Sequence, residues 1–216
     1  MKTILALVAC LSTAPVFAAP PPATLLQMVG VTLPAPRLAE SILLVVDAQR
    51  EYLDGKLPLA GMNASLVEAA TLLERARTAG APVVHVMHRA DGPLFNPKGE
   101  GYAIVAALRP LPGEKVVVKT QANAYTGTEL ERVLRETGRK QLIVVGYMTH
   151  NCVSATTRAA LDHGYRATVV AAATATRDLP DGRGGTIPAA TVQVANLAAL
   201  ADATALVVAR GEDIPE

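Results

Sequence analysis

Short apolar runs alternate with helical patterns along most of the chain. Six runs are continuous and rich in β-branched residues: SILLVVD (41–47), APVVHVMH (81–88), KVVVK (115–119), QLIVVGY (141–147), RATVVAA (166–172) and TALVVA (204–209). Such runs are typical of strands that are covered on both faces. Helical spacing of apolar residues predicts four helices, at 63–80, 126–138, 151–164 and 187–202, with Asn63 as the N-cap of the first.

The strict alternation of strands and helices predicts an α/β fold. We expect a doubly wound, mostly parallel six-stranded sheet with helices on both faces, because parallel neighbours need right-handed crossover connections. The globular domain should occupy residues 39–216. One connection, 89–114, contains DGPLFNPKGEGY and RPLPGE and is long for a compact domain, which is typical of a functional loop.

The N-terminus has the layout of a secretory signal peptide. Residues 1–18 combine Lys2, an apolar run from Ile4 and small residues near Ala18, and the run is too short to span a bilayer. Cleavage after Ala18 would leave a proline-rich leader at 19–38. The alternative is lipid attachment at Cys10 in LVAC, but its apolar segment is short for a signal core. The interpretation we favour predicts a secreted or periplasmic protein without membrane contact after cleavage.

Composition narrows the range of partners. The chain has 20 basic and 19 acidic side chains, so loss of Lys2 would make it formally neutral, and we expect no nucleic-acid partner. Cys10 would leave with the signal, which leaves Cys152 as the single cysteine. In an oxidising compartment an odd cysteine forms an intermolecular bridge, lies inert in the core, or reacts.

Polar residues follow three of the predicted strands. Asp47 ends the first apolar run, Lys119 ends the third, and Cys152 follows the fourth through GYMTHN. Ligands of open parallel sheets bind beyond the carboxyl ends of the strands, so we expect these three residues on one edge. Each has an ordinary alternative: a capping aspartate, a lysine that reaches solvent, or a buried packing cysteine.

This combination of residues suits covalent catalysis. Cys152 falls in the first turn of a predicted helix, where free N–H groups and the helix dipole should lower the pKa of the thiol. Asp47 could accept the thiol proton and later pass it to a leaving amine. Lys119 could hold the Asp47 carboxylate, and N–H groups at the helix start could bind an oxyanion.

Three segments resemble one known family, the isochorismatase-like cysteine hydrolases, which include nicotinamidases and N-carbamoylsarcosine amidase. They are LLVVDAQREY, VVVKTQANAYTGTEL and VVGYMTHNCVSATTRAA, and the resemblance extends from about Ser41 to Ala209. The resemblance implies a catalytic triad of Asp47, Lys119 and Cys152. It also implies a cis peptide between Tyr147 and Met148, which would bring the Met148 N–H beside that of Cys152 as an oxyanion donor.

The resemblance also suggests residues that line the pocket. The candidates are Gln49, Tyr52, Asn123 and Tyr125. Tyr52 could equally serve in packing, and Thr149 should fix its loop through a backbone hydrogen bond rather than react. DGRGG (181–185) lacks the lysine of a phosphate loop and is interpreted as a flexible turn.

We expect neither a metal nor another cofactor. Metal-dependent nicotinamidases carry an Asp-x-His element and further histidines after the second strand, where this chain reads MHRADGPLFNPKGEG. His85 and His88 lie three positions apart on a predicted strand and should point to opposite faces, which makes a poor chelate. Relatives of this kind commonly assemble, so we expect a homo-oligomer that acts on a small molecule.

The function predicted from the sequence is hydrolysis of a small amide through an acyl-enzyme on Cys152. Family members that cleave isochorismate do not use the cysteine, so its presence favours an amide substrate. The alternatives are a non-catalytic binding protein, a thiol redox sensor on the same fold, and a thiol that only fills the core. The sequence names no substrate.

Overall fold

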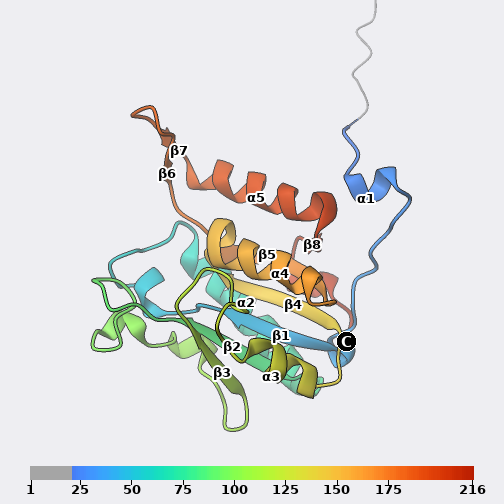
Figure 1. Ribbon diagram of the computed structural model, residues 1–216, viewed down its shortest axis with the longest axis horizontal. Coiled ribbons are helices and arrows are strands. Elements are labelled where there is room, and N and C mark those ends of the chain that lie inside the picture. Colours follow the sequence, from blue (N-terminus) through green and yellow to red (C-terminus); the bar gives the residue numbers. More distant parts are fainter. Residues whose placement is uncertain (1–20) are drawn as a thin grey trace, which may run out of the picture.

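A six-stranded parallel sheet forms the centre of the protein in the computed structural model, which describes residues 21–216 (Figure 1). Its strands are β1 (Ser41–Val46), β2 (Val83–His88), β3 (Lys115–Lys119), β4 (Gln141–Tyr147), β5 (Arg166–Ala175) and β8 (Leu206–Val208). The helices are α1 (Leu25–Met28), α2 (Met62–Thr78), α3 (Leu130–Glu136), α4 (Ser154–Asp162) and α5 (Ala189–Ala203). The predicted α/β architecture is therefore confirmed.

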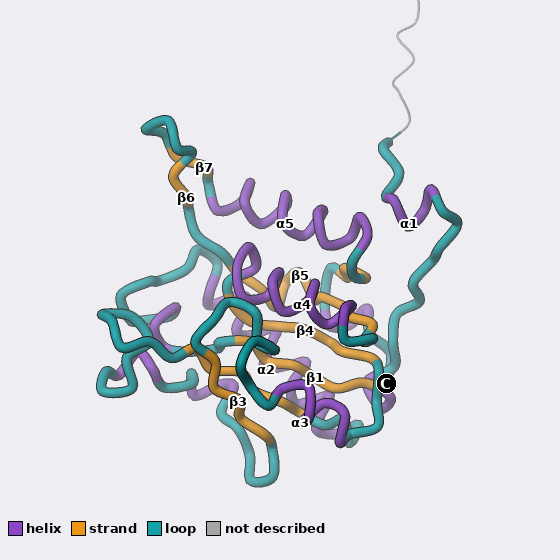
Figure 2. The backbone as a smooth tube through the Cα atoms, viewed as in Figure 1, coloured by secondary structure: helices purple, strands orange, loops and turns teal. Residues whose placement is uncertain are grey.

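The strand order is β3-β2-β1-β4-β5-β8, so the chain reverses its direction of travel across the sheet between β1 and β4. Such a reversal opens a crevice beyond the carboxyl ends of the two strands. The longest loops gather beyond one end of the sheet (Figure 2). This is the edge where the sequence places its candidate chemistry.

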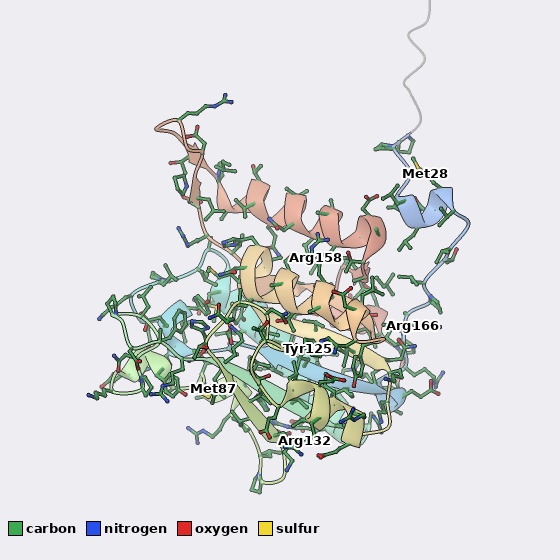
Figure 3. All side chains as sticks on the ribbon, in the orientation of Figure 1. Met28, Met87, Tyr125, Arg132, Arg158 and Arg166 are labelled. Atoms are coloured by element: carbon green, nitrogen blue, oxygen red, sulfur yellow. The ribbon has the colours of Figure 1, made fainter. Side chains whose placement is uncertain are left out.

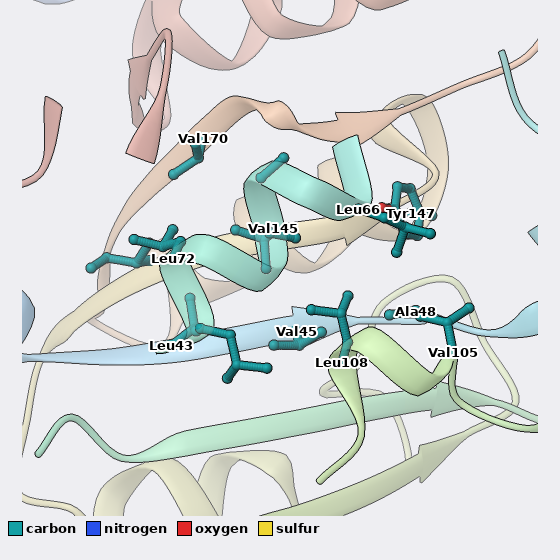
Figure 4. Packing of buried hydrophobic residues seen from close by; sticks show 14 of the residues in the cluster. Leu43, Val45, Ala48, Leu66, Leu72, Val105, Leu108, Val145, Tyr147 and Val170 are labelled. Carbon is teal, nitrogen blue, oxygen red and sulfur yellow. The ribbon is translucent and has the colours of Figure 1, made fainter. Parts of the chain in front are cut away.

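Two hydrophobic cores explain why the strands are apolar on both faces. Alternate residues of β1 point to opposite sides: Leu43 and Val45 pack towards α2, while Leu44 and Val46 pack towards α3, α4 and α5. Figure 4 shows the first core, with Leu66 and Leu72 of α2 over the sheet. Each buried aliphatic side chain contributes about 1.5–3 kcal/mol relative to exposure.

Gly146 lets β4 lie close against β1. Its φ is 117°, and a Cβ at this position would stand 2.0 Å from the Val46 carbonyl oxygen. The pairing of β4 with β5 also shifts register between Val144 and Gly146. Only glycine fits here, one residue before the strand ends at Tyr147.

All four predicted helices start at other residues than expected: α4 begins at Ser154 rather than 151 and α5 at Ala189 rather than 187, and the first two starts differ for local reasons. The first helix begins at Met62 after a Gly61 N-cap with φ 73°, so the Asn63 cap was wrong. The second begins at Leu130 rather than 126, because the Thr128 hydroxyl donates to the Ala124 carbonyl and accepts the Leu130 N–H, which holds the preceding turn outside the helix.

The N-terminal leader and a short hairpin lie outside the sheet. The predicted signal peptide, including Cys10, lies outside the described residues. The leader is extended except for α1, where Thr24 forms a capping box with Gln27. DGRGG is the turn of a hairpin between β6 (Leu179–Pro180) and β7 (Thr186–Ile187). No helix within residues 21–216 is long and apolar enough to cross a membrane.

The long segment 89–114 is fastened along its length to the residues after β1. The Arg50 N–H donates to Ala103, and the Val105 N–H donates to Ala48. Buried Glu51 accepts the Phe95 N–H at 3.4 Å. The segment is therefore an ordered wall beside the sheet edge.

Candidate active site

Asp47, Lys119 and Cys152 meet at the carboxyl edge of the sheet. Asp47 follows β1, Lys119 ends β3, and Cys152 lies in the turn after β4. All three are buried, at 0%, 1% and 3% exposure. The Lys119 Nζ lies 2.7 Å from the Asp47 Oδ2 and 3.2 Å from the Cys152 Sγ, so one ammonium group bridges the carboxylate and the thiol.

Asp47 has unusual geometry for a non-glycine residue. Its φ is 47°, a left-handed conformation that aspartate tolerates better than most side chains and that often marks functional sites. The carboxylate forms a 2.7 Å ion pair with Lys119, and contacts with the Lys119 and Cys152 side chains and the His88 backbone favour its charged form. An ionised carboxylate has about four lone-pair sites, so Asp47 can hold Lys119 and still accept a proton.

The electrostatics of the site run against one prediction from the sequence. Burial raises the pKa of Cys152 to about 12, the charge of Asp47 raises it further, and Lys119 offsets only part of this. The position at a helix start was expected to lower the thiol pKa, but desolvation of the buried sulfur has the larger effect. Burial also raises the pKa of Asp47, against the charge of Lys119.

The Cys152 turn has the backbone form expected from the resemblance. The Tyr147–Met148 peptide is cis, and residues Thr149–Val153 form one π-helical turn before α4. The Thr149 hydroxyl donates to the Ala175 carbonyl at 3.0 Å, which fixes the loop as predicted. The Met148 N–H forms no hydrogen bond with another described residue.

Gln49 and Tyr52 lie in the wall of the site. Gln49 is completely buried; its amide donates to the carbonyls of His88 and Tyr102 and accepts the His88 N–H. Both amide N–H donors and one oxygen lone pair are therefore used within the protein, so Gln49 supports the wall of the site rather than reaching a substrate as expected. Tyr52 packs edge-on against Phe95 at 5.1 Å, and the charges of Asp47 and Cys152 add to burial in raising its pKa.

Asn123 and Tyr125 are less well placed. The Asn123 Oδ1 accepts the Tyr125 N–H, and the Tyr125 ring stacks on His163 at 4.3 Å. His163 follows the far end of α4, about 14 Å along the helix from its start. Figure 3 shows Tyr125 in front of the sheet, between α4 and α3. Tyr125 is therefore a packing residue, and Asn123 supports its loop.

Two residues near the site were missed from the sequence. His88 ends β2 at the same edge, and its Nδ1 lies 3.2 Å from the Lys119 Nζ. Arg177 follows β5, next to Thr176, whose hydroxyl contacts His150 in the cysteine turn. The test that found Asp47 and Lys119, a polar residue at a strand end, could have found His88 as well.

The two histidines of β2 diverge, as predicted. The His85 Nε2 contacts the Glu114 Oε2 at 2.9 Å, whereas His88 faces Lys119. Within residues 21–216, no three histidine, cysteine or acidic side chains are grouped in a way that would hold a metal ion.

Comparison with known proteins identifies the family. Residues 41–207 match the model of the isochorismatase domain. The secreted isochorismatase effector Isc1 of Verticillium dahliae is 38% identical over 82% of this chain and 91% of its own length. The isochorismatase family protein YddQ of Bacillus subtilis is 42% identical over 73% of this chain and 89% of its own.

Solved structures agree. The crystal structure of an isochorismatase from Pseudomonas putida KT2440 matches with a TM-score of 0.85 and 41% identity, over 89% of this chain and 99% of that one. Other relatives are hydrolases, including a streptothricin hydrolase of Streptomyces noursei and a maleamate amidohydrolase of Pseudomonas putida. The parallel sheet, the order of the three motifs and these matches lead to one conclusion: the chain belongs to the isochorismatase family.

Proposed function

We propose that the protein is an exported cysteine hydrolase that cleaves a small amide through an acyl-enzyme on Cys152. The observation that carries this proposal is the buried Lys119 ammonium, which contacts both the Asp47 carboxylate and the Cys152 thiol. Amide-hydrolysing relatives support the reaction class. Export rests on the signal-like N-terminus and is supported by the name of the secreted relative.

In the proposed cycle, Asp47 takes the thiol proton while the Cys152 sulfur attacks the amide carbonyl. The oxyanion is held by the N–H groups of Met148 and Cys152. Protonated Asp47 then gives its proton to the leaving nitrogen as the C–N bond breaks. A water molecule, deprotonated by Asp47, then attacks the thioester; as the C–S bond breaks, the carboxylic acid product leaves and Asp47 returns the proton to the Cys152 sulfur.

The raised pKa values fit this sequence of steps. Before substrate binds, the thiol is protonated, so the cysteine has low nucleophilic reactivity. Asp47 is a better proton acceptor because burial raises its pKa, and the positive charge of Lys119 stabilises the carboxylate before transfer and the thiolate after it. Neither before nor after the proton transfer is a charge buried alone, which would be costly.

The site also favours a substrate with an anionic group. Among residues 21–216, Arg177 forms no ion pair, and its Nε is buried without a partner; its one hydrogen bond within the protein goes to the Asp178 carbonyl. An uncompensated guanidinium beside the cysteine turn would bind a carboxylate through charge-assisted hydrogen bonds. Maleamate, named for one relative, is a substrate of this kind.

A non-catalytic binding protein or thiol redox sensor is the second candidate. The raised pKa of Cys152 favours it, because a protonated buried thiol is inert in the absence of a base. The buried Asp47 carboxylate with its raised pKa favours the hydrolase, because a sensor has no need of a proton acceptor at the thiol.

An ammonia-release screen separates the candidates. Small amides are supplied in pairs, one neutral and one with a carboxylate, to the wild type, Cys152→Ala and Cys152→Ser. We expect turnover by the wild type only, and mass spectrometry of quenched reactions should find the acyl group on the peptide that contains Cys152. Full activity of Cys152→Ala on a confirmed substrate would eliminate the covalent route.

Arg177→Gln tests the preference for anions. We expect KM for the carboxylate-bearing amide to rise about 10–100-fold, which is the value of one or two charge-assisted hydrogen bonds, with little change for the neutral amide. Arg183→Gln, in the exposed hairpin turn, is the matched control. Equal effects of the two variants would remove Arg177 from the binding site.

A further inference from the structure

The Lys119 ammonium makes three close polar contacts. They reach the Asp47 Oδ2 at 2.7 Å, the Cys152 Sγ at 3.2 Å and the His88 Nδ1 at 3.2 Å. An ammonium has three N–H donors and no acceptor, so each contact can use one hydrogen. Two contacts belong to the proposed reaction, while the third is made by a side chain that the proposed cycle does not use.

The third contact fixes the state of the histidine. A ring nitrogen accepts a hydrogen bond only when it carries no proton, so His88 must be neutral with its proton on Nε2. Burial, together with the charge of Lys119, lowers the pKa of His88 to about 4, in agreement with a neutral ring at neutral pH. A protonated ring would instead place two cations 3.2 Å apart.

The surroundings of His88 hold the ring in place. His88 and Lys119 are register partners on the neighbouring strands β2 and β3. Gln49 binds the His88 backbone on both sides, accepting its N–H at 2.8 Å and donating to its carbonyl at 3.0 Å. Phe95 packs on the ring at 5.2 Å with an interplanar angle of 84°. The Nδ1 lone pair is therefore directed before substrate arrives.

We propose that His88 is a positioning residue, whose neutral imidazole binds one hydrogen of the Lys119 ammonium and thereby aims the other two at Asp47 and Cys152. Without this acceptor, the ammonium can rotate or turn to another partner, and the bridge between carboxylate and thiol loosens. The buried amide of Gln49 then has a role as well, because its hydrogen bonds hold the His88 backbone. This inference rests on the proposed hydrolase activity.

The test uses substitutions that separate the acceptor from the ring. In His88→Asn the amide oxygen stands close to the position of Nδ1, while His88→Leu has similar bulk and no acceptor. We expect His88→Leu to lower kcat about 10–100-fold, the usual effect of losing a supporting partner at a site, with KM changed less than threefold. His88→Asn should recover most of kcat.

His85→Leu, on the same strand, is the matched control. It should lower stability and leave kcat unchanged, because the His85 ring contacts Glu114 and not Lys119. Cys152→Ala is assayed in parallel: if it keeps activity, the proposed function fails, whereas loss of activity there with unchanged kcat in His88→Leu overturns the role of His88 alone. Equal kcat for His88→Asn and His88→Leu also overturns it.

A spectroscopic measurement on the wild type is independent of how the variants fold. Nitrogen-15 NMR of labelled imidazole rings distinguishes the two neutral tautomers and the imidazolium. We expect His88 in the form with the proton on Nε2 at neutral pH. A proton on Nδ1, or a charged ring at pH 7, would exclude the proposed contact.

Discussion

Two clusters of charged and histidine side chains lie at opposite ends of β2 and β3. The active-site cluster, at the carboxyl end, consists of Asp47, Lys119, Cys152 and His88. The Glu114 cluster, at the amino end, consists of Arg77, His85 and Glu114. Both combine a carboxylate, a cation and a histidine in largely buried positions, yet their hydrogen bonding differs.

The Glu114 carboxylate makes four hydrogen-bond contacts. Arg77 donates to both oxygens at 2.8 and 2.9 Å, and the Leu111 N–H and His85 contact Oε2 at 2.8 and 2.9 Å. Burial would raise the pKa of Glu114, but these hydrogen bonds outweigh it and lower the pKa to about 2. The arrangement stabilises the ion and makes the carboxylate a poor proton acceptor.

The Asp47 carboxylate is completely buried, and burial outweighs the charge of Lys119 and raises its pKa. Similar groups are thus held in the charged state by hydrogen bonds at the amino end of the strands, and remain able to accept a proton at the carboxyl end. The balance between burial and hydrogen bonding at the carboxylate, rather than the presence of acid and base, separates the structural cluster from the proposed catalytic one.

Replacing the cation should have opposite consequences at the two ends. We expect Lys119→Met to lower kcat/KM by about 10³-fold, within the range for acid–base catalysis, because Asp47 without its counter-charge would hold a proton and could not accept another. Arg77→Met should instead lower the free energy of unfolding by about 2–3 kcal/mol and leave kcat/KM within about twofold of the wild type. Steady-state kinetics and urea unfolding test both, and an exchange of the two outcomes would refute the distinction.

The reactivity of Cys152 should reveal its raised pKa. With a pKa of about 12, the thiolate fraction grows tenfold per pH unit, so iodoacetamide labelling should accelerate by about 100-fold from pH 7 to 9 and show no plateau at pH 10. The rate is followed by mass spectrometry of the intact protein. A plateau near pH 7 would mean that the site lowers the thiol pKa, as a helix start alone would do.

The Glu114 cluster should control stability in acid. A carboxylate whose pKa is depressed in the folded state stabilises the fold above its unfolded pKa and loses that contribution as pH falls. For Glu114 the loss should extend from about pH 4.5 down to about pH 2. Urea unfolding across this range should show a smaller dependence in Glu114→Gln than in the wild type, while parallel curves would contradict the assignment.

The smallest effect is expected at Tyr125. Among residues 21–216 its hydroxyl has no hydrogen-bond partner, so Tyr125→Phe removes an unsatisfied group and should change the free energy of unfolding by less than about 1 kcal/mol, in the stabilising direction. Activity should not change, because the ring stacks on His163 away from Cys152. A clear rise in KM would return Tyr125 to the substrate pocket.

The sequence was sufficient for the sheet because local patterns carry that information. Continuous apolar runs mark the strands, and parallel strands bring their carboxyl ends to one edge, so Asp47, Lys119 and Cys152 could be grouped from the sequence alone. The sequence does not predict how deeply these three side chains are buried. The shift in the pKa of Cys152 depends on how tightly distant segments close over the thiol.

Residues whose partners are distant in the chain were the hardest to predict. Gln49 resembled a pocket residue, but its amide binds the backbone of His88 and Tyr102, 39 and 53 positions away. The Asn63 cap failed for a local reason, since Gly61 could take the left-handed conformation that starts the helix one residue before it. Residue spacing alone predicts neither the partners of Gln49 nor the first residue of this helix.

The fastening of segment 89–114 has a consequence for redesign. Its backbone is held by Ala48, Arg50 and Glu51, which follow β1 and lie outside the Asp47, Lys119 and Cys152 group. The stretches between these anchors can therefore be exchanged as cassettes with those of related proteins, provided that each insert keeps the anchoring backbone groups. Substrate range could then be varied by loop grafting while the reacting residues stay untouched.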